Sequence, residues 1–425
     1  MLKTILQWTL RLTGMTLVVA ASVFILQRSD PRLITIEDRT RVYTRNVEFD
    51  YITWTIDALL GKQAQNTLAG TNYLSDQARH DLVVNQVKLL GQIRKLESEI
   101  NQVYTNPKVV DPAAATLEKR NQLSALKTRR DQREGLVEEI LQQQVSQVLA
   151  DLGLTAGGQP VPPVLYHVTP LPLALIISPR DIIRQDVNLS LQPGLSVDEK
   201  VSIENKVEAG LDVSALVVPV GGVGVYPTMV MSTTDLDWLA ETISHEWVHN
   251  FLTLRPLGMR YFISGELRTM NETTASLAGK EIGAIVISRY YPEFVPPPAP
   301  TTPQPTQPPA DQPPLFDFRK EMHITRVKAD ELLAEGKIQE AEAYMESRRQ
   351  VFWQNGYLIR KLNQAYFAFY GAYADIPGGE AGADPVGPAV VAFRQANPNL
   401  ATFLRRIGEM TSFEELQQTL QSLQK

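Results

Sequence analysis

Two of the five histidines in this 425-residue chain, His245 and His249, lie four positions apart, and Glu246 directly follows the first. Four residues advance an α-helix by slightly more than one turn, so both imidazoles would face one side of a helix, about 6 Å apart along its axis. Two imidazoles placed in this way can bind one metal ion. Glu246 would lie at the edge of that face, where a carboxylate can accept a proton from water without binding the metal. The H-E-x-x-H spacing therefore indicates a candidate site for metal-assisted hydrolysis.

The residues around this motif predict the helix that such a site requires. Residues 232–234 are Ser and Thr and offer N-cap side chains, and Asp235 and Asp237 would lie in the first turn. An apolar stripe would pack against the core, formed by Leu236, Leu239, Ile243 and Trp247. Pro256 marks the end of the helix.

A catalytic zinc site needs a third protein ligand. A histidine six residues after His249 would be one choice, but position 255 is Arg. Further along, residues 270–275 read Met-Asn-Glu-Thr-Thr-Ala and open a second helical run, which would place Glu272 in its first turn. Glu272 is therefore the leading third ligand, and Glu266 is a less favoured substitute.

The two motifs together, H-E-x-x-H and then N-E-x-x-A on a second helix, resemble those of the gluzincin peptidases. The resemblance implies a zinc ion (Zn2+) held by His245, His249 and Glu272, with Glu246 as the catalytic base and a peptide or protein as the substrate. The 22 residues between His249 and Glu272 make a slightly longer connection than this family pattern has. Asn271 would orient Glu272, bind a peptide carbonyl or cap its helix.

The C-terminal region carries a second, looser resemblance. Residues 360–373 contain Asn-x-Ala before a tyrosine-bearing helix, and with residues 385–404 they are similar to the tail of a bacterial aminopeptidase-like family. The two resemblances cover about residues 215–425. The second one suggests an aminopeptidase, and the sequence leaves the choice between exopeptidase and endopeptidase open. Tyr370 or Tyr373 would then donate a hydrogen bond to the oxyanion, although an aromatic stripe with this spacing is also typical of core packing.

Between residues 157 and 231 the composition predicts strands. Five β-branched runs are separated by Pro and Gly: VLYHV, LALIIS, VNLSL, ALVVPV and YPTMVM. Pro219 and Pro227 flank or interrupt the last two, so we expect an edge ribbon there. The strand at 225–231 precedes the metal helix, and we expect it to pair with extended substrate, with Tyr226 contributing to substrate binding. The preceding GGVGV at 221–225 is interpreted as a turn.

The first half of the chain predicts helices. An apolar seam with alternating spacings of four and three is typical of a coiled coil, and is formed by Leu89, Ile93, Leu96, Ile100 and Val103. Pro107 and Pro112 interrupt it, and a second helix follows to about Leu152. We expect an antiparallel helical hairpin, which could also support a homo-oligomer.

The N-terminal segment is apolar from Leu12 to Ile25, with Lys3 and Arg11 before this run. Extended backward, the run approaches the roughly 20 residues that span a bilayer. We expect an uncleaved single-pass membrane anchor rather than a cleaved signal. The body is expected on the extracytoplasmic side, although the arginines after the run favour the opposite orientation under the positive-inside rule.

Charge and composition exclude several classes of protein. Lys and Arg number 41 against 47 Asp and Glu, a net charge of −6, so we expect no nucleic-acid partner. The chain has no cysteine, which excludes disulfides and thiolate ligands and leaves His, Asp and Glu to hold a metal.

The sequence as a whole predicts a predominantly helical α+β protein with a zincin-like domain, a small edge-stranded sheet and C-terminal helices. The expected parts are a membrane anchor or signal at 1–30, a helical coiled-coil hairpin at 31–155, a catalytic region at 156–295, a Pro-rich linker at 296–314 and a helical remainder at 315–425. The function predicted is that of a membrane-anchored zinc metallopeptidase. The alternative is a non-catalytic membrane-anchored scaffold that binds partners through its helices.

Overall fold

The computed structural model describes residues 35–68, 70–105, 109–295, 316–371 and 385–423, together with Thr16. The predicted membrane segment, Thr16 apart, and the predicted Pro-rich linker lie outside these residues, as does Tyr373. Among the residues described, no helix is both long enough and apolar enough to cross a bilayer.

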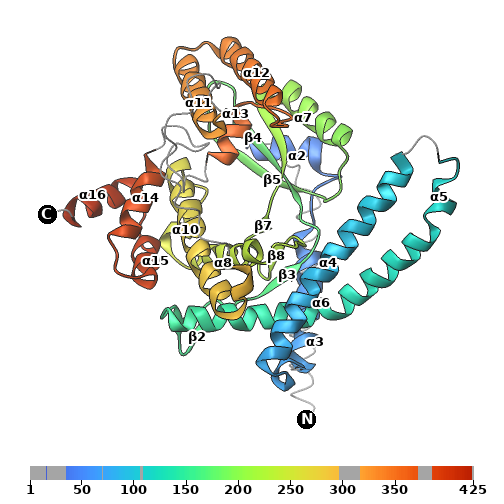
Figure 1. The fold of residues 1–425 in the computed structure, drawn as a ribbon. Coiled ribbons are helices and arrows are strands. Elements are labelled where there is room, and N and C mark those ends of the chain that lie inside the picture. Colours follow the sequence, from blue (N-terminus) through green and yellow to red (C-terminus); the bar gives the residue numbers. More distant parts are fainter. Residues whose placement is uncertain are drawn as a thin grey trace, which may run out of the picture.

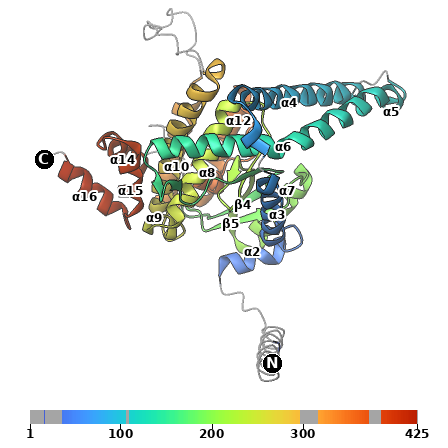
Figure 2. The same cartoon turned by 90° about the horizontal axis from the view of Figure 1, so that it is seen from below.

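The described part of the chain is predominantly helical with three small sheets, which confirms the α+β fold class (Figure 1). Two long helices form the predicted antiparallel hairpin, α4 (Asp76–Thr105) and α6 (Leu117–Asp151), with the short α5 (Pro112–Ala115) at its tip. The tip extends away from the rest of the molecule in both views (Figures 1 and 2). Of the predicted seam, three side chains are buried: Leu89, Ile93 and Ile100.

The hairpin packs closely with other parts of the fold. The second half of α6 is buried from Val137 to Leu149 and shares one hydrophobic core with the helices of the metal motif. The predicted hairpin segment also contains α2 (Ile36–Thr44), which packs against α7 (Val197–Leu211), and α3 (Tyr51–Leu68). The residues at 31–155 therefore contribute to several parts of the fold. Between α3 and α4 lies the short η1 (Gly70–Tyr73).

All five predicted strands form. The larger sheet has the order β5-β4-β6 and is antiparallel throughout. Its strands are β4 (Leu173–Pro179), β5 (Val187–Leu191) and β6 (Val213–Pro219). The second sheet has the order β3-β8-β7, and its strands are β3 (Tyr166–Val168), β7 (Gly222–Val223) and β8 (Thr228–Val230). A further hairpin joins β1 (Thr155–Ala156) to β2 (Gln159–Pro160).

The edge prediction is right for β6 and wrong for β8. β6 is an outer strand, whereas β8 pairs in parallel with β3 on one side and antiparallel with β7 on the other. The physical reason is that Gly222 and Val223, in the segment predicted as a turn, form β7 and satisfy the backbone groups on that side of β8. β7 is therefore an outer strand of this sheet, and β3 is the other.

The two faces of the larger sheet are covered by different helices. Alternating side chains such as Leu175 and Ile177 pack with α7, and those between them, such as Ala174 and Ile176, pack with the first C-terminal helices. These helices are α11 (Phe318–Ala334), α12 (Ile338–Gln354) and α13 (Gln364–Tyr370).

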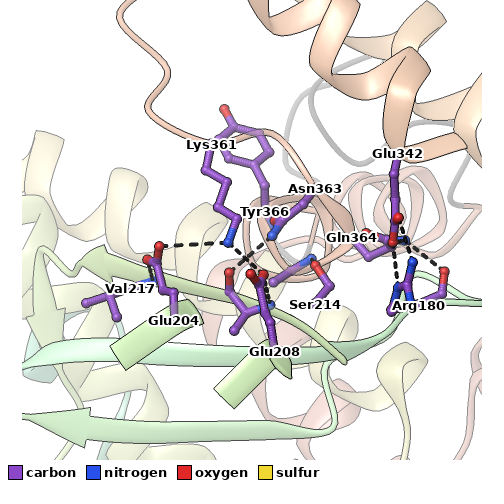
Figure 3. A network of polar contacts seen from close by, with 12 residues as sticks. Arg180, Glu204, Glu208, Ser214, Val217, Glu342, Lys361, Asn363, Gln364 and Tyr366 are labelled. Carbon is purple, nitrogen blue, oxygen red and sulfur yellow. Dashed lines mark hydrogen bonds and ion pairs between the residues drawn. The ribbon is translucent and has the colours of Figure 1, made fainter. Parts of the chain in front are cut away.

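Ion pairs fix these C-terminal helices to the sheet (Figure 3). The Arg180 guanidinium binds both carboxylate oxygens of Glu342, from α12, with Nε–Oε1 and Nη2–Oε2 distances of 2.8 Å. The Lys361 Nζ donates to Glu208 Oε1 of α7 at 2.6 Å. Because two-pronged guanidinium contacts are geometrically specific, they set the position of the segment beyond residue 315 on the sheet.

The main core is built around α8 (Leu236–Thr253) and α10 (Gly265–Tyr290), which lie side by side (Figure 1). The short α9 (Pro256–Met259) connects them, and η2 (Pro292–Phe294) follows α10. The last three helices pack on α10: α14 (Val386–Gln395), α15 (Leu400–Gly408) and α16 (Phe413–Leu423).

Gly279 of α10 permits the close approach of these two helices. A Cβ at this position would lie 3.0 Å from the Cα and the backbone nitrogen of His245. We expect Gly279→Ala to lower the free energy of unfolding by about 1–3 kcal/mol, because backbone atoms of the two helices must move apart. Urea denaturation measures this change. Gly91 in α4 is the matched control, since its Cβ would meet nothing within 4 Å. Gly91→Ala should stabilise the chain by about 0.5–1 kcal/mol, and equal effects of the two substitutions would refute the packing argument.

Candidate metal centre

The predicted helix of the first motif forms, but its cap differs from the candidates at 232–234. The N-cap is Asp235, which was expected in the first turn, and its side chain accepts a hydrogen bond from the backbone nitrogen of Trp238 at 3.0 Å. Trp247 is buried on the core side, and its indole nitrogen donates to the Pro162 carbonyl at 2.8 Å. With this face fixed in the core, His245 and His249 are presented on the opposite side, toward a cleft.

The second helix begins earlier than the sequence indicated. Ser264 caps α10, which starts at Gly265, so Glu272 lies about two turns into the helix rather than in its first turn. The first turn instead contains Glu266, which is exposed to solvent. Glu272 is 5% exposed, and it is held by a helix that is buried along most of its length. This depth gives the third candidate ligand a rigid support.

The three predicted ligands converge on one point. The Nε2 atoms of His245 and His249 are 3.0 Å apart, and Glu272 Oε2 lies 3.7 Å from the first and 3.3 Å from the second. Ligand atoms of a tetrahedral zinc ion, each about 2.0–2.1 Å from the metal, are separated by about 3.3 Å. Glu272 Oε2 is also buried and accepts no hydrogen bond. The three side chains therefore fit one divalent metal ion, as their grouping within 4.8 Å also indicates.

Two further side chains hold these ligands in place. Asn271 Oδ1 lies 2.7 Å from His249 Nδ1, so it accepts a hydrogen bond from that ring and leaves Nε2 directed at the metal position. Asn271 thus orients a candidate ligand, and Ser264 rather than Asn271 caps the helix. Asn271 also lines the cleft, and its role in substrate binding stays a prediction. The Tyr261 hydroxyl donates to Glu272 Oε1.

Tyr261 was missed by the sequence analysis. It lies in the connection between α9 and α10 and lines the cleft beside His249. The signal available in the sequence was the slightly long connection between the two motifs, which contains this tyrosine.

Glu246 lies on the cleft side of α8, against the glycine-rich strand β7. A Cβ on Gly222 would clash with its carboxylate, and a Cβ on Gly224 would come within 3.2 Å of both Glu246 Oε2 and the Cβ of His249. Burial raises the pKa of Glu246, with the charge of Glu272 adding to the effect, while the two histidines oppose it. The glycine backbone at residues 222 and 224 therefore leaves room for the Glu246 carboxylate and little else. A buried carboxylate with a raised pKa is suited to accept a proton.

The charges of the metal-free centre are strongly coupled. Burial alone would lower the pKa of His249, but the neighbouring Glu272 carboxylate outweighs it, and with Glu246 and Asn271 it raises the pKa to about 9. Burial alone would raise the pKa of Glu272, but the charge of His249 and the contacts with both histidines hold it well below its usual range. Without a metal, a proton on His249 therefore neutralises the carboxylate.

A metal ion must displace this proton, since a ligating imidazole nitrogen carries none. We expect zinc uptake at pH 7.5 to release about one proton per chain, measured by calorimetry in buffers of different ionisation enthalpy. Because the pKa of His249 is about 9, zinc affinity should rise up to about tenfold per pH unit between pH 7 and 9 and then level off. Uptake without proton release in this range would contradict the coupling between His249 and Glu272.

The other predicted site residues lie elsewhere. Tyr370 contacts Tyr366 with tilted rings, whose centroids are 4.5 Å apart, and it is partly buried against the core under the larger sheet, because Asn363 caps α13 and fixes this helix there. Tyr370 does not line the cleft, and Tyr373 is outside the described residues. The Tyr226 hydroxyl donates to the Pro163 carbonyl, at 3.2 Å, and Tyr226 is also absent from the described cleft lining. The structure thus corrects the positions predicted for Tyr370 and Tyr226.

The cleft has a volume of about 620 Å³ and borders all four residues of the motif pair, His245, Glu246, His249 and Glu272. Its lining near them includes β7 and the connection before α10, and it continues to β4 and β5. This volume falls in the range of sites that enclose a ligand. Comparison with models of known protein families, with curated proteins and with solved structures gave no match.

Proposed function

We propose that this protein is a zinc-dependent metallopeptidase. The observation that carries the proposal is the convergence of the His245, His249 and Glu272 ligand atoms at 3.0 to 3.7 Å, with Glu246 beside them in the same cleft. The zincin-like character of this region, inferred from its motifs, is part of the proposal. It is supported by an α8 helix that presents both histidines, an α10 helix that presents the glutamate and an outer strand next to the site.

A zinc ion held here would supply a Lewis acid that polarises a carbonyl and makes water more acidic. Glu246 would take the proton from the attacking water and transfer it to the departing amine. Its raised pKa favours this exchange, because an acid–base catalyst works best when its pKa approaches the working pH. Asn271 and Tyr261 would keep the ligands oriented during the reaction.

Tyr261 replaces Tyr370 as the candidate donor to the oxyanion. It is a phenol that lines the cleft next to the ligands, although its hydroxyl donates to Glu272 when no substrate is bound. β7 replaces the 225–231 strand as the candidate for pairing with substrate, because residues 222–225 line the cleft and β7 is an outer strand. Both are proposals within the peptidase mechanism.

Membrane attachment through residues 1–30, with the body on the extracytoplasmic side, remains part of the proposal. It is supported by the apolar run at 12–25 in the sequence. Protease treatment of intact cells would test it, since an extracytoplasmic body is cleaved from outside and a cytoplasmic one is protected. Self-association through the hairpin of α4 and α6 is likewise a proposal, which sedimentation of the purified protein would test.

The peptidase proposal is tested with a panel of substrates. We expect the zinc-loaded protein to cleave an unfolded protein such as casein and to lose this activity in a chelator, with products identified by mass spectrometry. Hydrolysis confined to non-peptide amides would exclude a peptidase. Binding of partners without any hydrolysis would favour the scaffold alternative.

A further inference from the structure

One strand of the larger sheet presents a polar face to the cleft. Along β5 the side chains of Val187, Leu189 and Leu191 are buried in the core with α7. The alternating residues Asn188 and Ser190 point to the opposite face, as the two-residue period of a strand requires, and both line the cleft.

This polar face is the part of the sheet that the C-terminal helices leave open. The hydrophobic side chains that pack with α11, α12 and α13 come from β4 and β6, the other two strands of the sheet. Figure 1 shows β5 apart from α8 and α10, which carry the candidate metal ligands. The lining of one continuous cleft includes residues of all three elements.

The cleft lining includes both apolar and polar side chains. The apolar ones include Val223 and Val225 in and next to β7, Met259 and Phe262 on either side of Tyr261, and Leu173 and Ala174 of β4. Toward β5 the lining includes uncharged polar groups: Tyr51, Gln185, Asn188 and Ser190. The Tyr51 hydroxyl and Ser190 Oγ are 2.7 Å apart, so these two groups are already ordered relative to each other.

Charged groups are few among the described lining residues. The carboxylates there are Glu246 and Glu272, and both belong to the metal centre. The basic residue of the described lining is Arg268, whose Nη2 donates to the Ala368 carbonyl at 3.2 Å.

We propose that the β5 side of the cleft is a binding site for an extended, uncharged stretch of polypeptide several residues from the scissile bond. A substrate that contacts both the metal centre and β5 extends several residues from the scissile bond, so we expect cleavage of interior peptide bonds, which departs from the aminopeptidase expectation. Asn188 supplies both a donor and an acceptor, and Ser190 and Tyr51 supply hydroxyls, which together match the alternating N–H and C=O groups of an extended chain. The inference rests on the proposed function, because the metal centre supplies the cleavage.

Peptide binding tests this site without requiring turnover. The probe is a fluorescent decapeptide of Ala, Ser and Gln with Leu-Phe at its centre and with both ends blocked. Its affinity is measured by anisotropy on the full-length, zinc-loaded Glu246→Gln protein. Adding Asn188→Ala and Ser190→Ala should weaken binding about tenfold, the effect of one or two lost hydrogen bonds. The matched control adds Asn101→Ala and Ser124→Ala, both exposed on the hairpin, and should leave affinity unchanged.

Two results would overturn the inference. One is that the Asn188→Ala and Ser190→Ala substitutions leave the affinity for the peptide unchanged, or that no binding is detected with or without them. The other is a free amino or carboxyl terminus that improves binding more than about tenfold over the blocked peptide, which would indicate an exopeptidase. Binding that depends on Asn188 and Ser190, with no hydrolysis by the protein that retains Glu246, would support the peptide site and refute the proposed function. The two proposals therefore fail separately.

Discussion

Replacement of Glu246 by glutamine is expected to reduce hydrolysis by about a hundredfold to ten-thousandfold, with one zinc ion still bound per chain. Glutamine has nearly the shape of glutamate and fits the space that Gly222 and Gly224 leave beside it. It cannot accept a proton from water, so only the acid–base step is lost. Zinc binding should persist, because the converging ligand atoms are those of His245, His249 and Glu272.

The measurement is kcat for peptide hydrolysis together with zinc content, both on the same preparation. Asp237→Asn is the control, since Asp237 is a carboxylate in the first turn of the same helix and does not line the described cleft. It should leave kcat nearly unchanged. Near-normal activity of Glu246→Gln would remove this residue from its proposed role.

Replacement of Glu272 by alanine should weaken zinc binding by more than about a hundredfold. This variant loses one of three ligands, whereas changes to residues that merely support ligands already reduce metal affinity by about tenfold to a hundredfold. The pKa of His249 should fall as well, because Glu272 is the largest of the influences that raise it. Competition with a chromophoric chelator measures the affinity, and NMR titration of the histidine measures the pKa.

Glu266→Ala is the matched control for this prediction. Glu266 is on the same helix but is exposed in its first turn, so its removal should leave zinc affinity unchanged. Weaker zinc binding in Glu266→Ala, with normal binding in Glu272→Ala, would mean that the third ligand is wrongly assigned.

Local signals predicted the parts of the fold that depend on local chemistry. The α8 helix begins within one residue of the predicted cap segment at 232–234 and ends before Pro256, because capping and proline act within one turn. The strands from residue 164 to residue 230 follow their β-branched composition. The hairpin followed from the seam that includes Leu89 and Ile93.

Features that depend on packing between distant segments could not be predicted from local signals. The segment with Gly222 and Val223 was interpreted as a turn because it is rich in glycine, which has a low strand preference. β7 forms because the backbone groups along one side of β8 need hydrogen-bond partners. Tyr370 and Tyr261 have the same chemistry, and only the positions of their elements place Tyr261 in the cleft and Tyr370 in the core.

The packing partners of α6 could not be predicted for the same reason. A repeating apolar stripe on α6 indicates that one face is buried but does not identify the partner. The stripe packs with α4 near the tip and, from Val137 onward, in the core that includes α8 and α10. The change of partner depends on where the metal helices lie, which the sequence of α6 does not specify.

The central claim is that one zinc ion is bound jointly by His245, His249 and Glu272 and is required for peptide hydrolysis. Elemental analysis by mass spectrometry, with hydrolysis measured on the same samples at graded zinc loading, tests it most directly. We expect zinc binding to saturate at one ion per chain. The rate of hydrolysis should rise in proportion to the bound zinc and should be zero in the metal-free protein. A protein that binds no zinc, or one that hydrolyses peptides equally well after the metal has been removed, would contradict it.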